Sequence, residues 1–131
     1  RILGGLLSGH QHAKKLLPFY KGGLLDKAVD LGDRLLRAFR TPTKMPMSRV
    51  NLKRGIVSGS SSTVTIAEAG SFLLEFGTLS SLTGNLEYYN TAKTSLLTFW
   101  SKRNHLDLVG TAIDVNSGRF VDQQSTTGPG Q

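Results

Sequence analysis

Two pairs of amphipathic helices, separated by a proline-bearing loop, are the feature that most constrains the fold of this chain. Apolar residues recur at helical spacing over 2–17 and 24–39, and again over 66–82 and 86–100. Pro18 ends the first helix, because proline cannot continue a helix interior. Each helix has an apolar stripe that must pack against a neighbour. The pattern therefore predicts stacked α-hairpins or part of an α/α toroid.

The segments between and after these pairs are predicted to be loops and short strands. Two prolines exclude a continuous helix through 41–46, which leads into a short extended piece at 49–52. The polar run 58–63 is interpreted as a connecting loop, because periodic segments resume directly after it. Over 113–121 the period changes, and an Asn-Ser-Gly turn predicts a β-hairpin. Residues 1–131 are thus expected to form part of a single domain, all-α with a small β-hairpin and no internal domain boundary.

Composition excludes several classes of protein and leaves the charge to be explained. The 131 residues include no cysteine, which excludes a disulfide scaffold, a CxxC zinc site and a thiol enzyme. No apolar run approaches the ~20 residues that a membrane span needs. Residues 1–54 hold 12 Lys+Arg against 3 Asp, a sum of +9, whereas residues 55–131 hold 4 Lys+Arg against 6 Asp+Glu, a sum of −2. This asymmetry favours either an anionic partner or a solvated basic helix face.

Short motifs for metal, nucleotide or serine-hydrolase chemistry do not occur in the sequence. It contains no HExxH, no GxxxxGK[ST] loop and no GxSxG elbow. His10 and His12 are two positions apart, so on a helix they point in different directions and are poor joint metal ligands. The residues themselves therefore predict no metal site.

Two carboxylates in the third predicted helix are the strongest candidates for chemistry. Glu68 and Glu75 are seven residues apart, which is two helical turns, so both are expected on the same side among apolar or small neighbours. Buried carboxylates need partners or they become protonated. Each either pairs with an arginine such as Arg1 or Arg49, or lines a polar pocket for a hydroxyl-rich ligand. Paired carboxylates are the groups that glycoside hydrolysis uses.

Five segments, in order along the chain, carry motifs of one enzyme family. Residues 1–10 read RILGGLLSGH, 31–43 LGDRLLRAFRTPT, 45–55 MPMSRVNLKRG, 67–82 AEAGSFLLEFGTLSSL and 113–118 IDVNSG. They are similar, respectively, to IR-x-x-GGLLSAH, LG-x-(R/K)LLPAF-x-TPTG, IPYPRVNLK-x-G, AGAGTLLLEFGTLSRLTG and I-(D/N)-(V/I)-x-TG. The chain thus resembles glycoside hydrolase family 47, the class I α-1,2-mannosidases and their EDEM-type relatives in glycoprotein degradation.

The resemblance implies a fold, a reaction and a cellular place. The family's fold is an (α/α)7 barrel, of which this chain would be a fragment supplying about two helical pairs and a hairpin. The implied reaction is calcium-dependent, inverting removal of α-1,2-linked mannose from high-mannose N-glycans of glycoproteins, in the lumen of the endoplasmic reticulum or Golgi. The rest of the barrel, or other chains of an assembly, would cover its remaining faces.

The resemblance also places the catalytic groups beyond both ends of the chain. The family's general-acid Glu lies four residues before the position of Arg1, and a second acidic group lies in a block expected after Gln131. The base and the Thr that holds calcium lie nearer the family's C-terminus. We therefore expect a segment of a longer protein, with no catalytic residue and no metal ligand of its own.

By the same resemblance, five residues are expected to bind substrate: Arg1, Arg49, Asn51, Glu68 and Glu75. Arg1 would hold a substrate hydroxyl or the carboxylate of the acid. Glu68 and Glu75 would shape the subsites.

Departures from the family motifs lie on the loop expected to border the sugar site. Arg37 stands in place of a proline, Lys44 in place of a glycine, and Met47-Ser48 in place of Tyr-Pro. Together with the basic first half, they favour a second hypothesis: a non-catalytic descendant, acting as a structural or interaction subunit of an organellar assembly with an acidic or RNA partner. An unrelated nucleic-acid-binding module is disfavoured, because no aromatic-plus-basic motif of that kind occurs.

Overall fold

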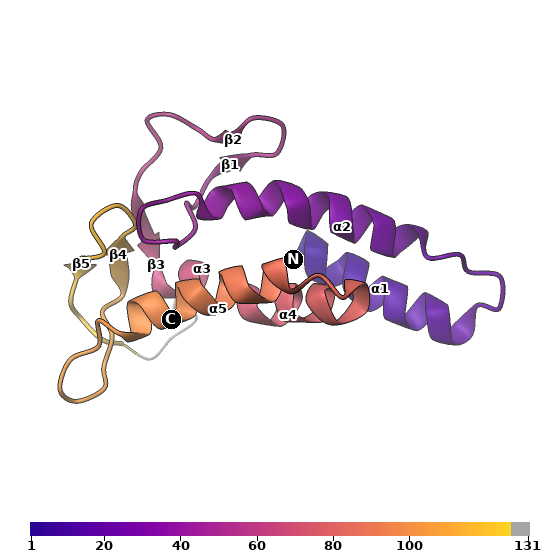
Figure 1. The fold of residues 1–131 in the computed structure, drawn as a ribbon. Coiled ribbons are helices and arrows are strands. Elements are labelled where there is room, and N and C mark those ends of the chain that lie inside the picture. The colour runs from indigo at the N-terminus through magenta and orange to yellow at the C-terminus, as the bar shows by residue number, and fades with distance from the viewer. Residues whose placement is uncertain (127–131) are drawn as a thin grey trace.

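Two helical hairpins lie side by side, with small sheets at one end, in a computed structural model that describes residues 1–126 (Figure 1). One hairpin is α1 with α2 and the other is α4 with α5; α1 and α2 both also contact α4. The elements in chain order are α1 (Ile2–Leu16), α2 (Gly23–Leu36), the 3-10 helix η1 (Arg37–Phe39), β1 (Val50–Asn51), β2 (Gly55–Ile56), β3 (Thr63–Thr65), α3 (Ile66–Gly70), α4 (Phe72–Thr83), α5 (Leu86–Trp100), β4 (Ala112–Asp114) and β5 (Phe120–Asp122).

Local signals account for where most helices begin and end. α1 ends at Leu16, two residues before Pro18. Gly84 ends α4 with a φ of 77°, a left-handed conformation that glycine adopts without steric cost. The Asn85 side chain then caps α5 by accepting a hydrogen bond of 3.0 Å from the backbone N–H of Glu87. The predicted helical pairs are thereby confirmed.

Aromatic rings fill the space between the two helical hairpins. Phe76 is fully buried in α4, and its ring centroid lies 5.2 Å from that of Phe72 and 5.7 Å from those of Phe39 and Tyr88. A Cβ on Gly32 of α2 would lie 2.5 Å from Leu79 Cδ2, so glycine lets α2 approach α4 closely. These contacts bind α2, α4 and α5 into one hydrophobic core.

The predicted C-terminal hairpin is confirmed, but it belongs to a larger sheet. β4 and β5 pair antiparallel, and β3 adds a third strand with Val64 opposite Ile113. β3 was not expected, because its residues end a polar run and gain their pairing only from a strand almost fifty residues later. A second, two-stranded hairpin joins β1 to β2, which confirms the extended piece at 49–52 and adds its partner.

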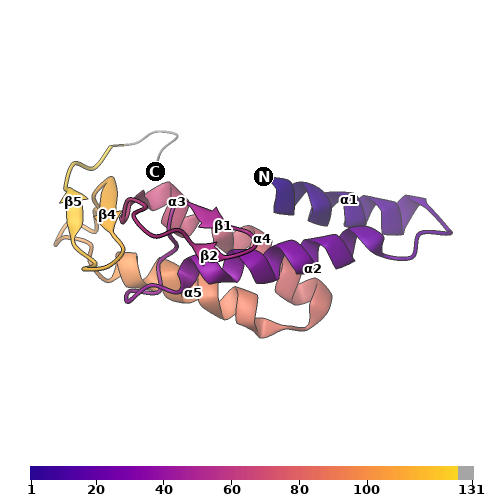
Figure 2. The ribbon, with the colours of Figure 1, turned by 90° about the horizontal axis from the view of Figure 1, so that it is seen from above.

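The third predicted helix, over 66–82, is wrong in one respect. The structure divides it into α3 and α4, with Ser71 between them. Figure 2 shows α3 near the sheets and α4 alongside α2. Residues of α3 belong to a second hydrophobic cluster with the sheet and the loop, made of Met45, Val64, Ile66, Ala69, Phe99, Ile113 and Val115. The expected single helix is therefore two helices, of which α3 packs in this second cluster and α4 packs in the core between the helical hairpins.

Asp114 organises the turn of the sheet by accepting four hydrogen bonds. Ser62 Oγ donates to Oδ2 at 2.5 Å, while the backbone N–H and hydroxyl of Ser117 and the backbone N–H of Asn116 donate to Oδ1 at 2.6, 2.8 and 3.1 Å. These donors, the Ser62 hydroxyl first, lower the pKa of Asp114 from 3.8 to about 2. The ionised carboxylate therefore joins β3 to the β4–β5 turn.

Replacing Asp114 with asparagine is expected to destabilise the protein in a pH-dependent way. A carboxylate whose folded-state pKa is depressed contributes stability above its unfolded pKa, and that stability is lost as the pH falls through the folded value. D114N should thus cost about 1 kcal/mol near neutral pH, and the deficit should shrink between about pH 4 and pH 2. Urea unfolding of wild-type and D114N protein across that pH range measures the difference in unfolding free energy. S62A, which removes one donor to Asp114, should show the same dependence on pH. A deficit that stays constant down to pH 2 would contradict this role.

Several large apolar side chains remain at the surface of the described residues. Phe19 is 92% exposed, Leu74 81% and Ile2 74%. The expectation that other parts of a barrel or other chains cover such faces stays a prediction. Within residues 1–126, no helix has both the length and the apolar content to cross a membrane.

Candidate functional site

Arg1 and Glu75 line the same hollow, of about 420 Å³, between α1, α2 and α4. Its walls are mostly apolar, with Leu35, Leu52 and Phe72 among them. A Cβ on Gly4 would lie 3.5 Å from Glu75 Oε1, an ordinary contact distance, so α1 passes close to the carboxylate. One guanidinium and one carboxylate over an apolar wall can hold a polar ligand that also has a non-polar face. We call this the Arg1–Glu75 hollow.

Arg49 and Glu68 line a second hollow, of about 580 Å³, where the chain enters β1 and leaves β2. The rest of its lining is the polar run around Ser58 to Ser61. Glu68 also caps α3: its Oε2 accepts from the backbone N–H of Thr65 at 2.9 Å, and Thr65 Oγ1 accepts from the N–H of Glu68 at 3.2 Å. Glu68 therefore has a structural role in addition to its place in this Arg49–Glu68 hollow.

Asn51 is used inside the β1–β2 turn. Its Oδ1 accepts hydrogen bonds from the backbone N–H groups of Lys53 and Arg54, both at 2.9 Å. An oxygen that already accepts two bonds is poorly available to a ligand, although the amide NH₂ retains its donors. The substrate-binding role expected of Asn51 stays a prediction, now with a turn-forming role beside it.

The structure separates the two candidate carboxylates. The sequence predicted Glu68 and Glu75 on one side of one helix, but the break at Ser71 leaves each in its own hollow. Neither forms an ion pair with Arg1 or Arg49; the ion pairs within residues 1–126 are Arg34–Asp30 and Arg103–Asp107. Each hollow is thus lined by one arginine and one carboxylate that form no ion pair with each other.

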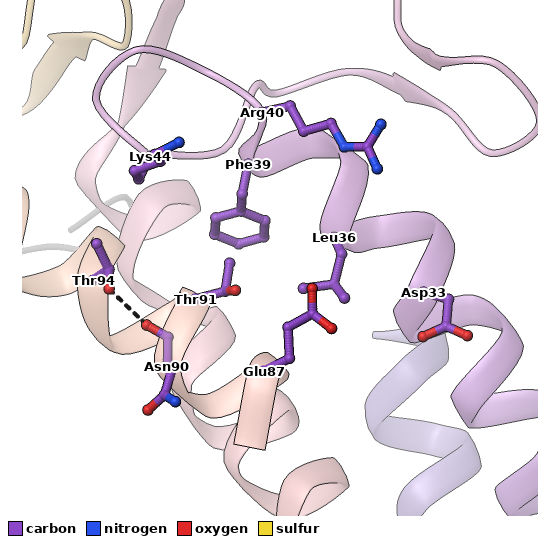
Figure 3. Close-up of a pocket in the computed structure, with 9 residues that line it drawn as sticks. All are labelled: Asp33, Leu36, Phe39, Arg40, Lys44, Glu87, Asn90, Thr91 and Thr94. Atoms are coloured by element: carbon purple, nitrogen blue, oxygen red, sulfur yellow. Dashed lines mark hydrogen bonds between the residues drawn. The ribbon is translucent and has the colours of Figure 1, made fainter. Parts of the chain in front are cut away.

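A third hollow, which the sequence did not reveal, lies on the other side of α2. It has about 570 Å³ and lies between the end of α2 and α5, and Figure 3 shows the Phe39 ring pointing between the helices. Its other lining residues are Asp33, Leu36, Arg40, Lys44, Glu87, Asn90, Thr91 and Thr94. Asp33 Oδ1 accepts a hydrogen bond of 2.5 Å from the Tyr88 hydroxyl. Burial and this bond to the carboxylate raise the pKa of Tyr88.

No local pattern predicts this α2–α5 hollow, because Asp33 and Tyr88 are 55 residues apart. The pair connects α2 to α5 beside the aromatic core, since Tyr88 is 2% exposed. The hollow is lined by two carboxylates, Asp33 and Glu87, and by two cations, Arg40 and Lys44. Its charges are therefore balanced.

Lys44 shows what one departure from the family motif does to the backbone. Its φ is +64°, in the left-handed region where a side chain costs roughly 1 kcal/mol relative to glycine. The family motif has glycine at this position. The lysine therefore adopts the glycine-like turn at an energetic cost and places a cation at the edge of the α2–α5 hollow.

Metal ligands are not gathered in this part of the protein. Residues 1–126 contain no group of three or more His, Asp or Glu side chains placed to hold a metal ion. His10 is buried and shares a hydrogen bond of 3.0 Å with the Tyr20 hydroxyl. The calcium implied by the resemblance does not fit any cluster of these residues.

Comparison with known proteins identifies relatives over nearly the full chain. It is 42% identical to ER degradation-enhancing alpha-mannosidase-like protein 1 of Schizosaccharomyces pombe, over 99% of this chain and 17% of that protein. It is 38% identical to Alpha-mannosidase I MNS5 of Arabidopsis thaliana, over 99% of this chain and 24% of that protein. The chain therefore spans about a fifth of the length of these relatives.

A solved structure shares the fold described above. An alpha-1,2-mannosidase from Trichoderma reesei matches with a TM-score of 0.78 and 29% identity, over 94% of this chain and 27% of that one. This likeness confirms the predicted fold class, helices with a small β-hairpin arranged as in part of an (α/α)7 barrel. The sequence profile of the family named Glycosyl hydrolase family 47 matches residues 1–131. The chain therefore belongs to glycosyl hydrolase family 47.

Proposed function

We propose that the protein binds high-mannose N-glycans of glycoproteins and releases α-1,2-linked mannose from them, in the lumen of the endoplasmic reticulum. The observation that carries this proposal is the Arg1–Glu75 hollow, an arginine and a carboxylate over an apolar wall in a family 47 chain. The names of the relatives, an alpha-mannosidase and an ER degradation-enhancing alpha-mannosidase-like protein, support the same substrate and place.

The chemistry of the hollow suits a mannose ring. A guanidinium offers five N–H donors and a carboxylate offers only acceptors, so Arg1 and Glu75 together can hold neighbouring sugar hydroxyls. Phe72 and Leu52 present apolar surface to the C–H face of the ring. In this proposal Arg1, Arg49, Glu68 and Glu75 bind and orient the glycan. Inversion needs an acid and a base on opposite sides of the sugar, and the family places both outside residues 1–131.

Mannose release from a high-mannose N-glycan, with and without a chelator, tests the proposal. Release that stops on chelation supports a calcium-dependent α-mannosidase. The matched control substrate is the same glycan from which the terminal α-1,2-linked mannoses have been removed, which should yield no mannose. No release from the intact glycan, under either condition, would overturn the proposal.

A non-catalytic role is the second candidate, and the Lys44 backbone favours it. A lysine in a glycine-like conformation marks a loop that has departed from the family motif at an energetic cost. In this alternative the glycan is bound, or a partner protein is bound, without hydrolysis. Glycan binding measured by calorimetry, together with no mannose release, would favour the alternative over the hydrolase.

A further inference from the structure

A long stretch of the chain carries positive charge, of which the proposed mannose site uses only Arg49. Residues 34–67 contain seven lysines and arginines and no aspartate or glutamate. High-mannose glycans are neutral, so their binding does not require this charge. The stretch runs from the end of α2 to the start of α3 and includes the β1–β2 hairpin. Its cations therefore need another explanation.

Three of these cations, Arg37, Lys53 and Arg54, lie in or directly beside the β1–β2 turn, and we call them the hairpin cations. Arg37 Nη1 donates a hydrogen bond of 2.8 Å to the carbonyl oxygen of Lys53. Gly55, with a φ of +94°, is buried against Arg37: a Cβ there would lie 3.7 Å from Arg37 Cβ and Cδ. Asn51 accepts from the N–H groups of Lys53 and Arg54 and so shapes their turn. Contacts of the protein itself thus hold Arg37 against the turn that carries Lys53 and Arg54.

The hairpin cations have no carboxylate partner within residues 1–126. Their neighbour Arg34, which donates to the carbonyl oxygen of Leu52, is bonded to Asp30 at 2.9 Å, and the other ion pair lies in the Arg103 loop. The α2–α5 hollow differs, because Asp33 and Glu87 balance its two cations. The charge of the hairpin cations is therefore not neutralised by a carboxylate of these residues.

The hairpin lies between the two hollows of the proposed glycan site. Leu52, next to Lys53, lines the Arg1–Glu75 hollow, and Arg49, just before β1, lines the Arg49–Glu68 hollow. Figure 1 shows the β1–β2 hairpin beside the C-terminal part of α2, the helix that Arg37 follows. If a mannose occupies either hollow, an anionic group that contacts the hairpin cations would have to be attached to the glycan. An acidic group on the peptide of the glycoprotein would lie farther away, because the inner sugars of the glycan separate the peptide from the bound mannose.

We propose that this protein prefers oligomannose glycans that carry a phosphoryl group, bound by Arg37, Lys53 and Arg54 beside the sugar site. The inference rests on the proposed function, since it assigns a substrate class to the same site. Arg37 keeps N–H donors beyond the one given to Lys53, and a guanidinium suits two phosphoryl oxygens. Lys53 and Arg54 add charge at the turn. Hydrogen bonds to phosphoryl oxygens then explain cations that a neutral glycan leaves unused.

Calorimetry with two matched glycans tests this preference. The full protein is titrated with a high-mannose glycan and with the same glycan bearing one phosphomonoester, at low and at physiological salt. Wild-type protein should bind the phosphorylated glycan about tenfold more tightly at low salt, with a smaller margin at high salt. The variant R37Q/K53Q/R54Q should lose the margin while its affinity for the neutral glycan stays unchanged. K53Q/R54Q, which keeps the bond from Arg37 to the turn, should lose part of it.

The matched control removes three cations elsewhere. K14Q/K15Q/K21Q lowers the net charge by the same amount at exposed positions in and after α1, and should keep the preference. Loss of preference in this control, or its retention in the hairpin variants, overturns the proposal. So does inorganic phosphate or an oligonucleotide that binds wild-type protein as tightly as the phosphorylated glycan.

The two proposals fail in distinguishable ways. Mannose release from the neutral glycan without any preference for the phosphorylated one overturns the phosphoryl site and leaves the mannosidase standing. A preference abolished by the hairpin variants, without mannose release from either glycan, supports the phosphoryl site and overturns hydrolysis. Binding of neither glycan overturns both.

Discussion

Replacing Phe76 with alanine is expected to destabilise the protein by about 3–5 kcal/mol. Phe76 has no exposed surface, and its ring contacts three others, those of Phe39, Phe72 and Tyr88. Truncation removes this buried apolar area and leaves a cavity that helices on three sides cannot close without moving. Because domains are stable by only about 5–15 kcal/mol, this loss is a large share of the total. Urea unfolding, followed by circular dichroism, measures it.

Phe19→Ala is the matched control for this prediction. It is the same substitution in the loop between α1 and α2, where the ring is 92% exposed. The unfolding free energy should change by less than about 0.5 kcal/mol. Equal losses of unfolding free energy in F76A and F19A would show that the contacts between Phe76 and the other rings do not stabilise the core.

Replacing Glu75 with glutamine is expected to lower kcat/KM for mannose release by about 10–100-fold. The substitution keeps the shape of the side chain but removes the charge that would accept hydrogen bonds from sugar hydroxyls. Hydrogen bonds to a charged group contribute about 1.5–3 kcal/mol, which corresponds to that range of rate. Glu75 makes no ion pair within residues 1–126, so the melting temperature should stay near that of wild-type protein.

Glu87→Gln provides the same chemical change in a different hollow. Glu87 lines the α2–α5 hollow, away from the Arg1–Glu75 hollow. Its effect on mannose release should be less than about twofold. Full activity in E75Q would remove the Arg1–Glu75 hollow from the proposed function, whatever the effect of E87Q.

The helices illustrate what short-range pattern can predict. Apolar spacing, Pro18, Gly84 and Asn85 act within a few residues of the element they begin or end, so the two helical pairs and the C-terminal hairpin followed from them. The family motifs likewise are runs of neighbouring residues, and their order predicted the family that the profile match shows. Strand β3 escaped prediction because its pairing partner, β4, lies far along the chain.

The candidate site depended on tertiary structure far more than the helices did. The sequence by itself determined which residue types are present, including Arg1, Glu75 and the seven cations of residues 34–67. Only the fold decided that Glu75 lies with Arg1 and Glu68 with Arg49, in separate hollows, and that Arg37 contacts the β1–β2 turn. The physical reason is distance along the chain: side chains dozens of residues apart meet only where packed helices bring them together, and helical periodicity carries no information about which helix packs against which.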